Sequence, residues 1–234
     1  AGAVLWWRAA KRGHDPQGAG LFLALNGLAP IFLIALPSTP IFGGVKHWMT
    51  GMPLLMLFGG YALSRLIEAL SAQVKGRLAR PLMATVIVAS VFAGPVSASI
   101  RHVSFGTGYY NALIANGIRG AADRKMMRLY WGHTSLQAMR WLNRHAPRGA
   151  RVYFQNTTRD AFEMYRRVGL LRHDIRYVRG VAPSQIALIE PQKAFAEIDL
   201  EVRQRYAVAG PVAVVRHDGV PMLRVYQRVG LPTP

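Results

Sequence analysis

The sequence predicts α-helical transmembrane segments followed by a small soluble domain of the α/β class, with a layered, mixed sheet. Residues 1–98 hold 8 of the 29 Lys and Arg residues and 2 of the 11 Asp and Glu residues, with long uncharged runs between short charged clusters. Residues 99–234 hold the other 21 and 9, dispersed as in a water-soluble domain. A composition change of this kind marks a domain boundary. We therefore expect a transmembrane region at 1–98 and a separate domain at 99–234, which is long enough to bury its own core.

Three runs in the first part have the length and apolar character of membrane spans. A hydrocarbon layer about 30 Å thick needs about 20 apolar helical residues, and the candidates are residues 18–36, 48–67 and 81–98. Within the second run, Arg65 and Glu68 lie one helical turn apart and can pair. The alternative, a set of buried helices in a soluble protein, is disfavoured because three such runs fall within 98 residues.

The short segments around these runs predict the orientation of the spans. Positive residues cluster before the first run and after the second, at Arg8, Lys11 and Arg12 and at Lys75, Arg77 and Arg80, whereas the segment between the first two runs carries only Lys46. Lys and Arg in short loops favour the cytoplasmic side. We therefore expect a multi-pass protein of the bacterial inner (plasma) membrane, with the Lys46 segment and the C-terminal domain on the periplasmic side.

The second part alternates helical and strand patterns. Helices are predicted at 136–145, 159–168 and 191–206, and strands at 151–154, 175–178, 185–189, 212–216 and 220–227. The early alternation favours a partly parallel sheet. His217-Asp218-Gly219 predicts a hairpin that adds antiparallel strands at one end. Thr134 or Ser135 is expected to cap the first of these helices, and Asn156, Thr157 and Thr158 supply a cap for the second.

Composition excludes several function classes. The net charge of +18 suggests nucleic acid, but the Arg residues are scattered with no single basic run, and anionic lipid headgroups explain the charge better. There is no cysteine, so we expect no disulfide, no zinc site and no thiol nucleophile. The seven histidines show no metal-ligand spacing, and no Gly-rich loop follows the strand at 151–154. We therefore predict no metal and no cofactor.

The candidate site residues are cations and aromatics near the predicted membrane surface. Lys46 and His47 stand between two apolar runs and can hold a lipid phosphate at the lipid–water boundary; alternatively, they are an interfacial Lys and a hydrogen-bonded His beside Trp48. Tyr109, Tyr110, Asn111 and Trp131 can line a donor or acceptor groove, or can simply anchor loops at the membrane interface or between domains. Asp160 is expected to stabilise the start of its helix through the dipole.

Several short motifs resemble those of a known enzyme family. They are Gly43-Gly44-Val45-Lys46-His47-Trp48-Met49 with Met52-Pro53-Leu54, Gly108-Tyr109-Tyr110-Asn111, Arg119-Gly120-Ala121, Tyr130-Trp131-Gly132, Trp141-Leu142-Asn143 and Ala146-Pro147-Arg148-Gly149-Ala150. In order and spacing they resemble the later part of family 39 glycosyltransferases, membrane enzymes of the GT-C class related to protein O-mannosyltransferases and aminoarabinose transferases. The resemblance covers most of residues 37–155.

The resemblance implies a polyprenyl-phosphate-linked sugar as donor, a protein or lipid acceptor, and an extracytoplasmic active site beside membrane lipid. Such enzymes carry their catalytic acidic residue on an early extracytoplasmic loop, and no segment of this chain fits that loop, so no catalytic residue is expected here. The first residue is Ala1 and the opening apolar residues look like the end of an earlier helix, so we expect further chain before it. The alternative function is a non-catalytic, membrane-anchored periplasmic binding module.

Overall fold

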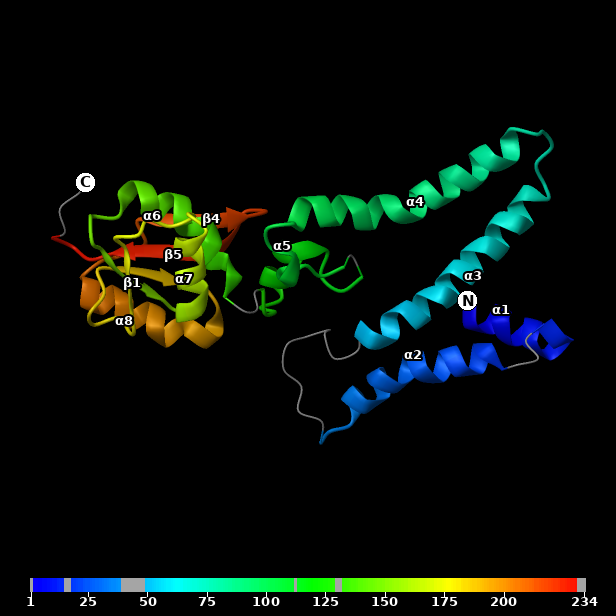
Figure 1. Ribbon diagram of the computed structural model, residues 1–234, viewed down its shortest axis with the longest axis horizontal. Helices are drawn as coiled ribbons and strands as arrows, with labels where there is room; N and C mark the ends of the chain where they lie inside the picture. The colour runs from blue at the N-terminus through cyan, green and yellow to red at the C-terminus, as the bar shows by residue number, and fades with distance from the viewer. Residues whose placement is uncertain (1, 15–17, 39–48, 112, 129–131, 231–234) are drawn as a thin grey trace. The chain divides into compact units, whose positions relative to one another are not determined.

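The computed structural model describes residues 2–14, 18–38, 49–111, 113–128 and 132–230 (Figure 1). The chain divides into two compact units, Ala1–Ala98 and Ser99–Pro234. The described residues form eight α-helices and a five-stranded mixed sheet, and all five strands lie in the second unit.

The first unit is entirely helical in its described residues. Its elements are α1 (Gly2–Ala9), a short π-helical segment η1 (Ala10–His14), α2 (Ala19–Ala35), α3 (Met52–Ser71) and α4 (Ala79–His102), whose last turn belongs to the second unit. Pro53 occupies the first turn of α3, where its missing N–H costs nothing. Arg65 and Glu68 form the ion pair that their spacing predicts.

Aromatic and glycine contacts hold the helices of the first unit together. The ring of Trp6 in α1 lies 5.6 Å from that of Phe58 and 5.1 Å from that of Tyr61, both in α3. Gly51 precedes α3 and approaches α2 closely, since a Cβ added there would lie 2.4 Å from the carbonyl oxygen of Gly27. Small residues at this contact therefore allow the two backbones to meet, as in the packing of membrane helices.

Two described helices are long and apolar enough to cross a membrane, Met49–Ser71 and Ala79–His102. The remaining predicted run, residues 18–36, contains α2, which agrees with the predicted bounds to within one residue at each end and, with 17 residues, has a length of about 25 Å. Its polar residue is satisfied internally, since the Asn26 side-chain amide donates to the carbonyl of Phe22 at 2.9 Å. The segment at 18–36 is thus a shorter apolar helix.

The second unit is built on a mixed sheet with the strand order β2-β1-β3-β5-β4. The central strand β1 is parallel to β2 and β3, whereas β5 is antiparallel to β3 and β4. The strands are β1 (Arg151–Phe154), β2 (Arg176–Val178), β3 (Ile186–Ile189), β4 (Ala213–His217) and β5 (Val220–Gln227). The predicted mixed sheet with an antiparallel hairpin at one end is confirmed.

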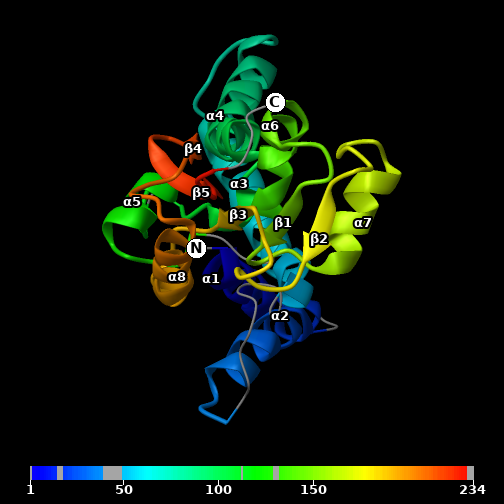
Figure 2. The same cartoon turned by 90° about the vertical axis from the view of Figure 1, so that its left-hand side faces the viewer.

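Helices cover both faces of this sheet (Figure 2). In β3, Ile186 and Leu188 join the core formed with α6 (Met139–His145) and α7 (Arg159–Arg167). The alternate residues Ala187 and Ile189 pack against α8 (Ala196–Tyr206). A strand that is buried on both faces has a continuous apolar sequence, and all four residues of β3 are apolar and buried.

The boundaries of two predicted helices are wrong. The first helix, α6, begins at Met139, and the residues before it, His133–Ala138, form a 3-10 segment, η4. Thr134 and Ser135 do not cap α6, because both are buried and their hydroxyls bond to other side chains. The last begins at Ala196, after a 3-10 turn η5 (Lys193–Phe195). The short elements η3 (Gly106–Gly108) and α5 (Gly117–Asp123) were not predicted.

Two local predictions are confirmed. Thr158 caps α7 by accepting a hydrogen bond from the Ala161 N–H at 3.2 Å, with Asp160 in the first turn. The hairpin turn is Asp218-Gly219, with φ of 47° and 78°, the left-handed pair that a tight two-residue hairpin requires.

Candidate functional site

Three of the predicted site residues, Lys46, His47 and Trp131, lie outside the described residues. Tyr109, Tyr110 and Asn111 are described and follow η3. The Tyr110 hydroxyl donates to the carbonyl of Met127 at 2.8 Å. The side-chain oxygen of Asn111 accepts from the backbone N–H groups of Leu113 and Ile114, both at 3.1 Å. Both side chains therefore stabilise their loop, and their role in a groove stays a prediction.

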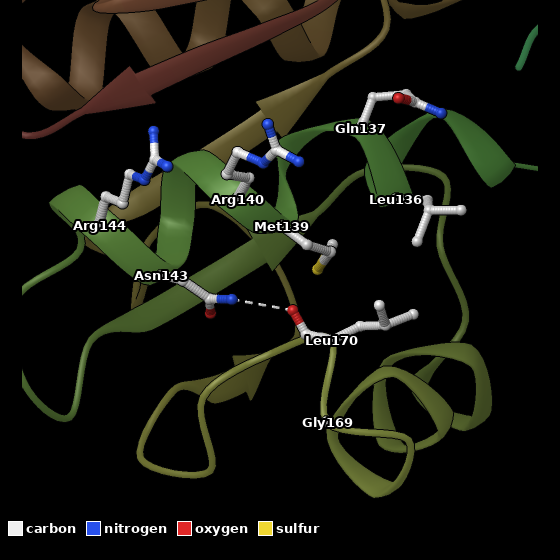
Figure 3. Close-up of a pocket in the computed structure, with 8 residues that line it drawn as sticks. All are labelled: Leu136, Gln137, Met139, Arg140, Asn143, Arg144, Gly169 and Leu170. Carbon is white, nitrogen blue, oxygen red and sulfur yellow. Dashed lines mark hydrogen bonds between the residues drawn. The ribbon is translucent and has the colours of Figure 1, made fainter.

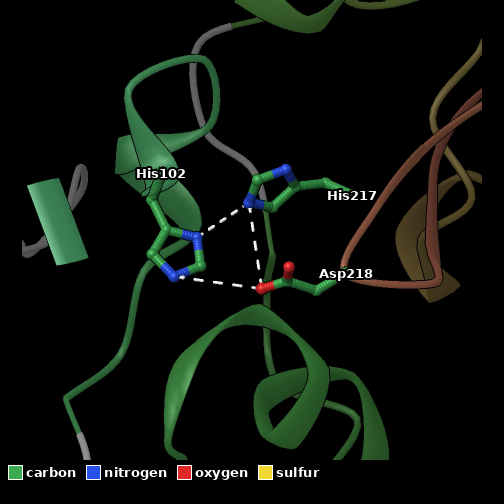
Figure 4. A group of neighbouring side chains, drawn as sticks. All are labelled: His102, His217 and Asp218. Carbon is green, nitrogen blue, oxygen red and sulfur yellow. Dashed lines mark hydrogen bonds and ion pairs between the residues drawn. The ribbon is translucent and has the colours of Figure 1, made fainter. Parts of the chain in front are cut away.

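Tyr109 packs against one of a pair of histidines, His102 and His217, that was not predicted from the sequence. Its ring lies 5.0 Å from the imidazole of His102, which in turn lies 2.8 Å, Nδ1 to Nε2, from the imidazole of His217 (Figure 4). The two histidines are 115 positions apart in sequence and no local spacing connects them. The prediction of no metal site rested on the absence of cysteine and on local histidine spacing, so it does not account for this cluster.

A second polar cluster lies where the parallel strands end. Glu190 follows β3 directly and is 2% exposed. One carboxylate oxygen accepts from the hydroxyl of Thr134. The other accepts from the amides of Asn156 at 3.0 Å and Gln192 at 3.2 Å. This edge cluster consists of Gly132, Thr134, Ser135, Asn156, Thr157, Glu190 and Gln192.

The edge cluster depends on Gly132, the glycine of the Tyr130-Trp131-Gly132 motif. Its φ is +63°, and a Cβ added there would lie 1.4 Å from the carbonyl oxygen of Asn156. The Gly132 carbonyl accepts from the hydroxyl of Thr157 at 2.9 Å, and that hydroxyl is also bonded to Ser135. Because both oxygens of Glu190 are occupied, the cluster as it stands stabilises the fold and leaves no free general base there.

A cation-lined pocket of about 470 Å³ adjoins the end of β3 through Gln192. We call it the cationic pocket; it is lined by Lys125, Arg128 and Lys193 together with Ala122, Met126, Met127, Gln192 and Ala194. Within the described chain no carboxylate forms an ion pair with any of the three cations. Cations over an apolar wall suit a ligand that is both anionic and apolar.

Arg128 is the best-fixed cation of this pocket. Its guanidinium donates to the carbonyl of Pro191, and Gly108 lets the chain approach its backbone, since a Cβ on Gly108 would lie 1.9 Å from the Arg128 carbonyl oxygen. Burial lowers the pKa of Arg128 from its ordinary value, and the neighbouring charge of Arg224 lowers it further. A bound anion would relieve this unfavourable environment.

A second hollow, of about 670 Å³, lies along α6 (Figure 3). Its charged side chains are Arg140 and Arg144, one helical turn apart, and no acidic side chain lines it. Met139 and Leu170 supply apolar surface, and the Asn143 amide donates to the Leu170 carbonyl at 2.9 Å. This groove can bind an anion but lacks a group for acid–base chemistry.

No protein-family model matches this chain, and no curated protein or solved structure matches it either. Similarity therefore adds nothing to the functional argument, which depends on the sequence and the geometry described above.

Proposed function

We propose that this chain is the C-terminal portion of a membrane glycosyltransferase. It would transfer a sugar from a polyprenyl-phosphate donor to a protein or lipid acceptor at the extracytoplasmic face of a bacterial inner membrane. The observation that carries the proposal is the combination of two long apolar helices with a basic α/β unit that contains a pocket both cationic and apolar.

The apolar helices support the membrane part of the proposal. In α4, Val86, Phe92 and Val96 each expose more than half of their surface within the described structure. Soluble proteins rarely leave contiguous apolar patches of this kind open to water. Lipid would cover these side chains without any further protein partner.

The charges between the helices support the orientation. The connection from α3 to α4 carries Lys75 and Arg77, and Arg80 lies in the first turn of α4. If this connection is cytoplasmic, two spans return the chain to the other side, so the Lys46 segment before α3 and the domain after α4 share the extracytoplasmic face.

The cationic pocket supports the donor class. A polyprenyl phosphate combines a charged phosphate with an apolar chain, and Lys125, Arg128 and Lys193 stand beside Met126 and Met127. Each cation near an anionic lipid headgroup contributes about 1 kcal/mol. We expect the double variant Lys125→Gln/Lys193→Gln to weaken polyprenyl-phosphate binding about 30-fold. Arg148→Gln, at an exposed position outside the pocket, is the matched control.

A second candidate is the non-catalytic, membrane-anchored binding module. The fully paired state of Glu190 favours it, because among the described residues this is the one buried carboxylate and it has no free oxygen for catalysis. The open groove along α6 with its two arginines would then bind an anionic cell-envelope polymer.

A transfer assay separates the two candidates. In the full-length protein, Lys46→Ala should reduce sugar transfer from a polyprenyl-phosphate donor by about 10²- to 10³-fold, because loss of one stabilising donor to a developing charge costs about 3–4 kcal/mol. His47→Ala should have a weaker effect, since a neutral imidazole only donates a hydrogen bond. Unchanged turnover in Lys46→Ala would remove Lys46 from the mechanism, and no transfer by the parent protein would favour the binding module.

A further inference from the structure

Three potential metal ligands converge in the second unit (Figure 4). His102 ends α4, while His217 ends β4 and Asp218 begins the turn to β5. One nitrogen of each imidazole and one carboxylate oxygen lie within 4.8 Å of one another. Oδ2 of Asp218 is 3.9 Å from Nε2 of His102 and 3.9 Å from Nε2 of His217.

The two imidazoles are held in place by packing. The His102 side chain is 6% exposed, and Tyr109 lies against its ring. The ring of Phe105, itself buried, lies 4.9 Å from that of His217. Nδ1 of His102 and Nε2 of His217 share a hydrogen bond of 2.8 Å, so at least one of these nitrogens carries no proton. An unprotonated imidazole nitrogen is the form that binds a metal ion.

We propose that His102, His217 and Asp218 form a binding site for a divalent transition-metal ion of the zinc class. Two imidazoles and one carboxylate are a ligand set that Zn²⁺ uses in proteins, and three protein ligands leave a fourth position for water or a substrate oxygen. His217 and Asp218 are 16% and 38% exposed, so the open position faces solvent.

Only a modest closure is needed to hold the ion. Each histidine offers one ring nitrogen, and the three ligand atoms lie within 4.8 Å of one another. Tetrahedral ligands at bond lengths of about 2.1 Å lie about 3.4 Å from one another, so no separation must shorten by more than about 1.4 Å. If Nδ1 of His102 is the ligand, its separation of 2.8 Å from Nε2 of His217 must widen by about 0.6 Å. Asp218 lies in a two-residue turn and His102 in the last turn of a helix, where such movements are local.

The bound ion would fix the last turn of α4, which belongs to the second unit, to the tip of the β4–β5 hairpin. This inference does not depend on the proposed transfer activity.

The experiment is a titration of the full chain, purified in detergent and stripped with a chelator, with Co²⁺ as a spectroscopic probe. We expect one Co²⁺ per chain, with the visible absorption of a four-coordinate ion, and its displacement by Zn²⁺. Two variants test the ligands: His217→Gln, and Asp218→Asn, which keeps the left-handed turn because Asn tolerates positive φ. Each should weaken binding by about 100-fold or more, since even the loss of supporting groups around a metal costs 10- to 100-fold.

His173→Ala is the matched control, because His173 is an exposed histidine of the same unit that lies outside the cluster. It should bind Co²⁺ like the parent. Circular dichroism of every variant establishes that each is folded. Absence of a stoichiometric Co²⁺ site in the parent would overturn the proposal. Parent-like binding by folded Asp218→Asn and His217→Gln would overturn it equally, as would a loss in His173→Ala as large as theirs.

Discussion

In the second unit Leu142, Ile186 and Leu188 are at most 1% exposed, whereas in the first unit Leu25, Phe32 and Phe92 expose between 54% and 65% of their surface. The same kinds of side chain therefore meet different surroundings along one chain. The second unit buries them between a sheet and its helices, which is the solution for water. The first unit turns them outward from single helices, which is stable where lipid replaces water.

The two units also differ in how their polar side chains are paired. In the second unit Asp199 accepts from Tyr226 at 2.8 Å and pairs with Arg224 at 3.1 Å, both on β5, besides its local pair with Arg203 at 2.9 Å. Two of the three partners of this partly buried carboxylate are therefore distant in sequence. In the first unit the described ion pair, Arg65 with Glu68, is local to one helix near its end. Asn26 likewise bonds within its own helix. Local pairing of this kind is what a helix in lipid requires.

The largest expected effect comes from separating the units. Residues 99–234 alone should be soluble, give the circular dichroism of a mixed α/β protein and melt cooperatively, because their core is formed within the unit. Residues 1–98 alone should need detergent to stay in solution. A flat melt from the isolated C-terminal part would show that its fold depends on the membrane region.

A matched pair of truncations sharpens the comparison. Leu142→Ala in α6 should lower the free energy of unfolding of the second unit by about 4 kcal/mol, since it opens a cavity in a closed core. Phe92→Ala in α4 removes a larger side chain but leaves no such cavity, so we expect a change well below about 1 kcal/mol. Chemical denaturation of the full chain in detergent, followed by circular dichroism, measures both. Equal losses would mean that α4 is packed against protein.

A charge tests which surface meets lipid. Val91→Arg in the middle of α4 should oppose membrane insertion by about 3 kcal/mol. Val212→Arg, at a similarly exposed position just before β4, should leave insertion unchanged because that surface faces water. The readout is the fraction of protein that resists extraction from membranes at alkaline pH. Insertion of Val91→Arg equal to that of the parent would place α4 outside the hydrocarbon layer.

The smallest effect concerns an ion pair of the second unit and its pH dependence. Arg172 donates to both oxygens of Asp174, at 2.9 and 2.8 Å, and to the carbonyls of Asn143, Ala146 and Pro147, so it fixes the end of α6. The Arg172 guanidinium holds the pKa of Asp174 well below its usual range, with the Gly149 N–H adding to the effect.

A depressed pKa in the folded state means that this stabilisation is complete above about pH 5 and is lost as the pH falls below the ordinary carboxyl value of about 4. Asp174→Asn should therefore cost about 1 kcal/mol at neutral pH, a modest value because the carboxylate is partly exposed. The difference from the parent should shrink in acid. Glu201→Gln, which removes a simple i,i+4 pair with Arg205, is the control and should cost about 0.3 kcal/mol.

Local signals in the sequence were sufficient to predict most of the helices and strands of the second unit. The strand at 151–154, the cap at Thr158 and the turn at Asp218-Gly219 depend on residues within a few positions of each other, and all three are confirmed. The predicted start of α6 was wrong because Thr134 bonds to Glu190, 56 residues away. Such a distant partner determines whether the Thr134 hydroxyl caps the helix or is buried, and the local sequence does not show it. The same limit hid the His102–His217 pair, since no local motif connects two residues that are 115 positions apart. The cationic pocket joins residues near 125 and 193 and could not be found from spacing either.

The first unit shows a different limit. Apolar length located all three helical runs, and among the described residues two of these helices are long and apolar enough to span a membrane while the third, at 19–35, is a shorter apolar helix. The candidate residues Lys46, His47 and Trp131 lie outside the described residues, so their roles stay predictions.

Accessibility of single cysteines in whole cells can test whether α3 and α4 span the membrane with the second unit in the periplasm, and the chain has no cysteine of its own. We would place one cysteine at a time at Gln73, between α3 and α4, at Val91 in α4 and at Val212 in the second unit, and label with a maleimide that enters the periplasm but does not cross the inner membrane. The account predicts labelling of Val212→Cys in intact cells, of Gln73→Cys only after lysis, and of Val91→Cys only after denaturation in detergent. Labelling of Gln73→Cys but not Val212→Cys in intact cells would reverse the topology, and rapid labelling of Val91→Cys after lysis alone would contradict a membrane-spanning α4.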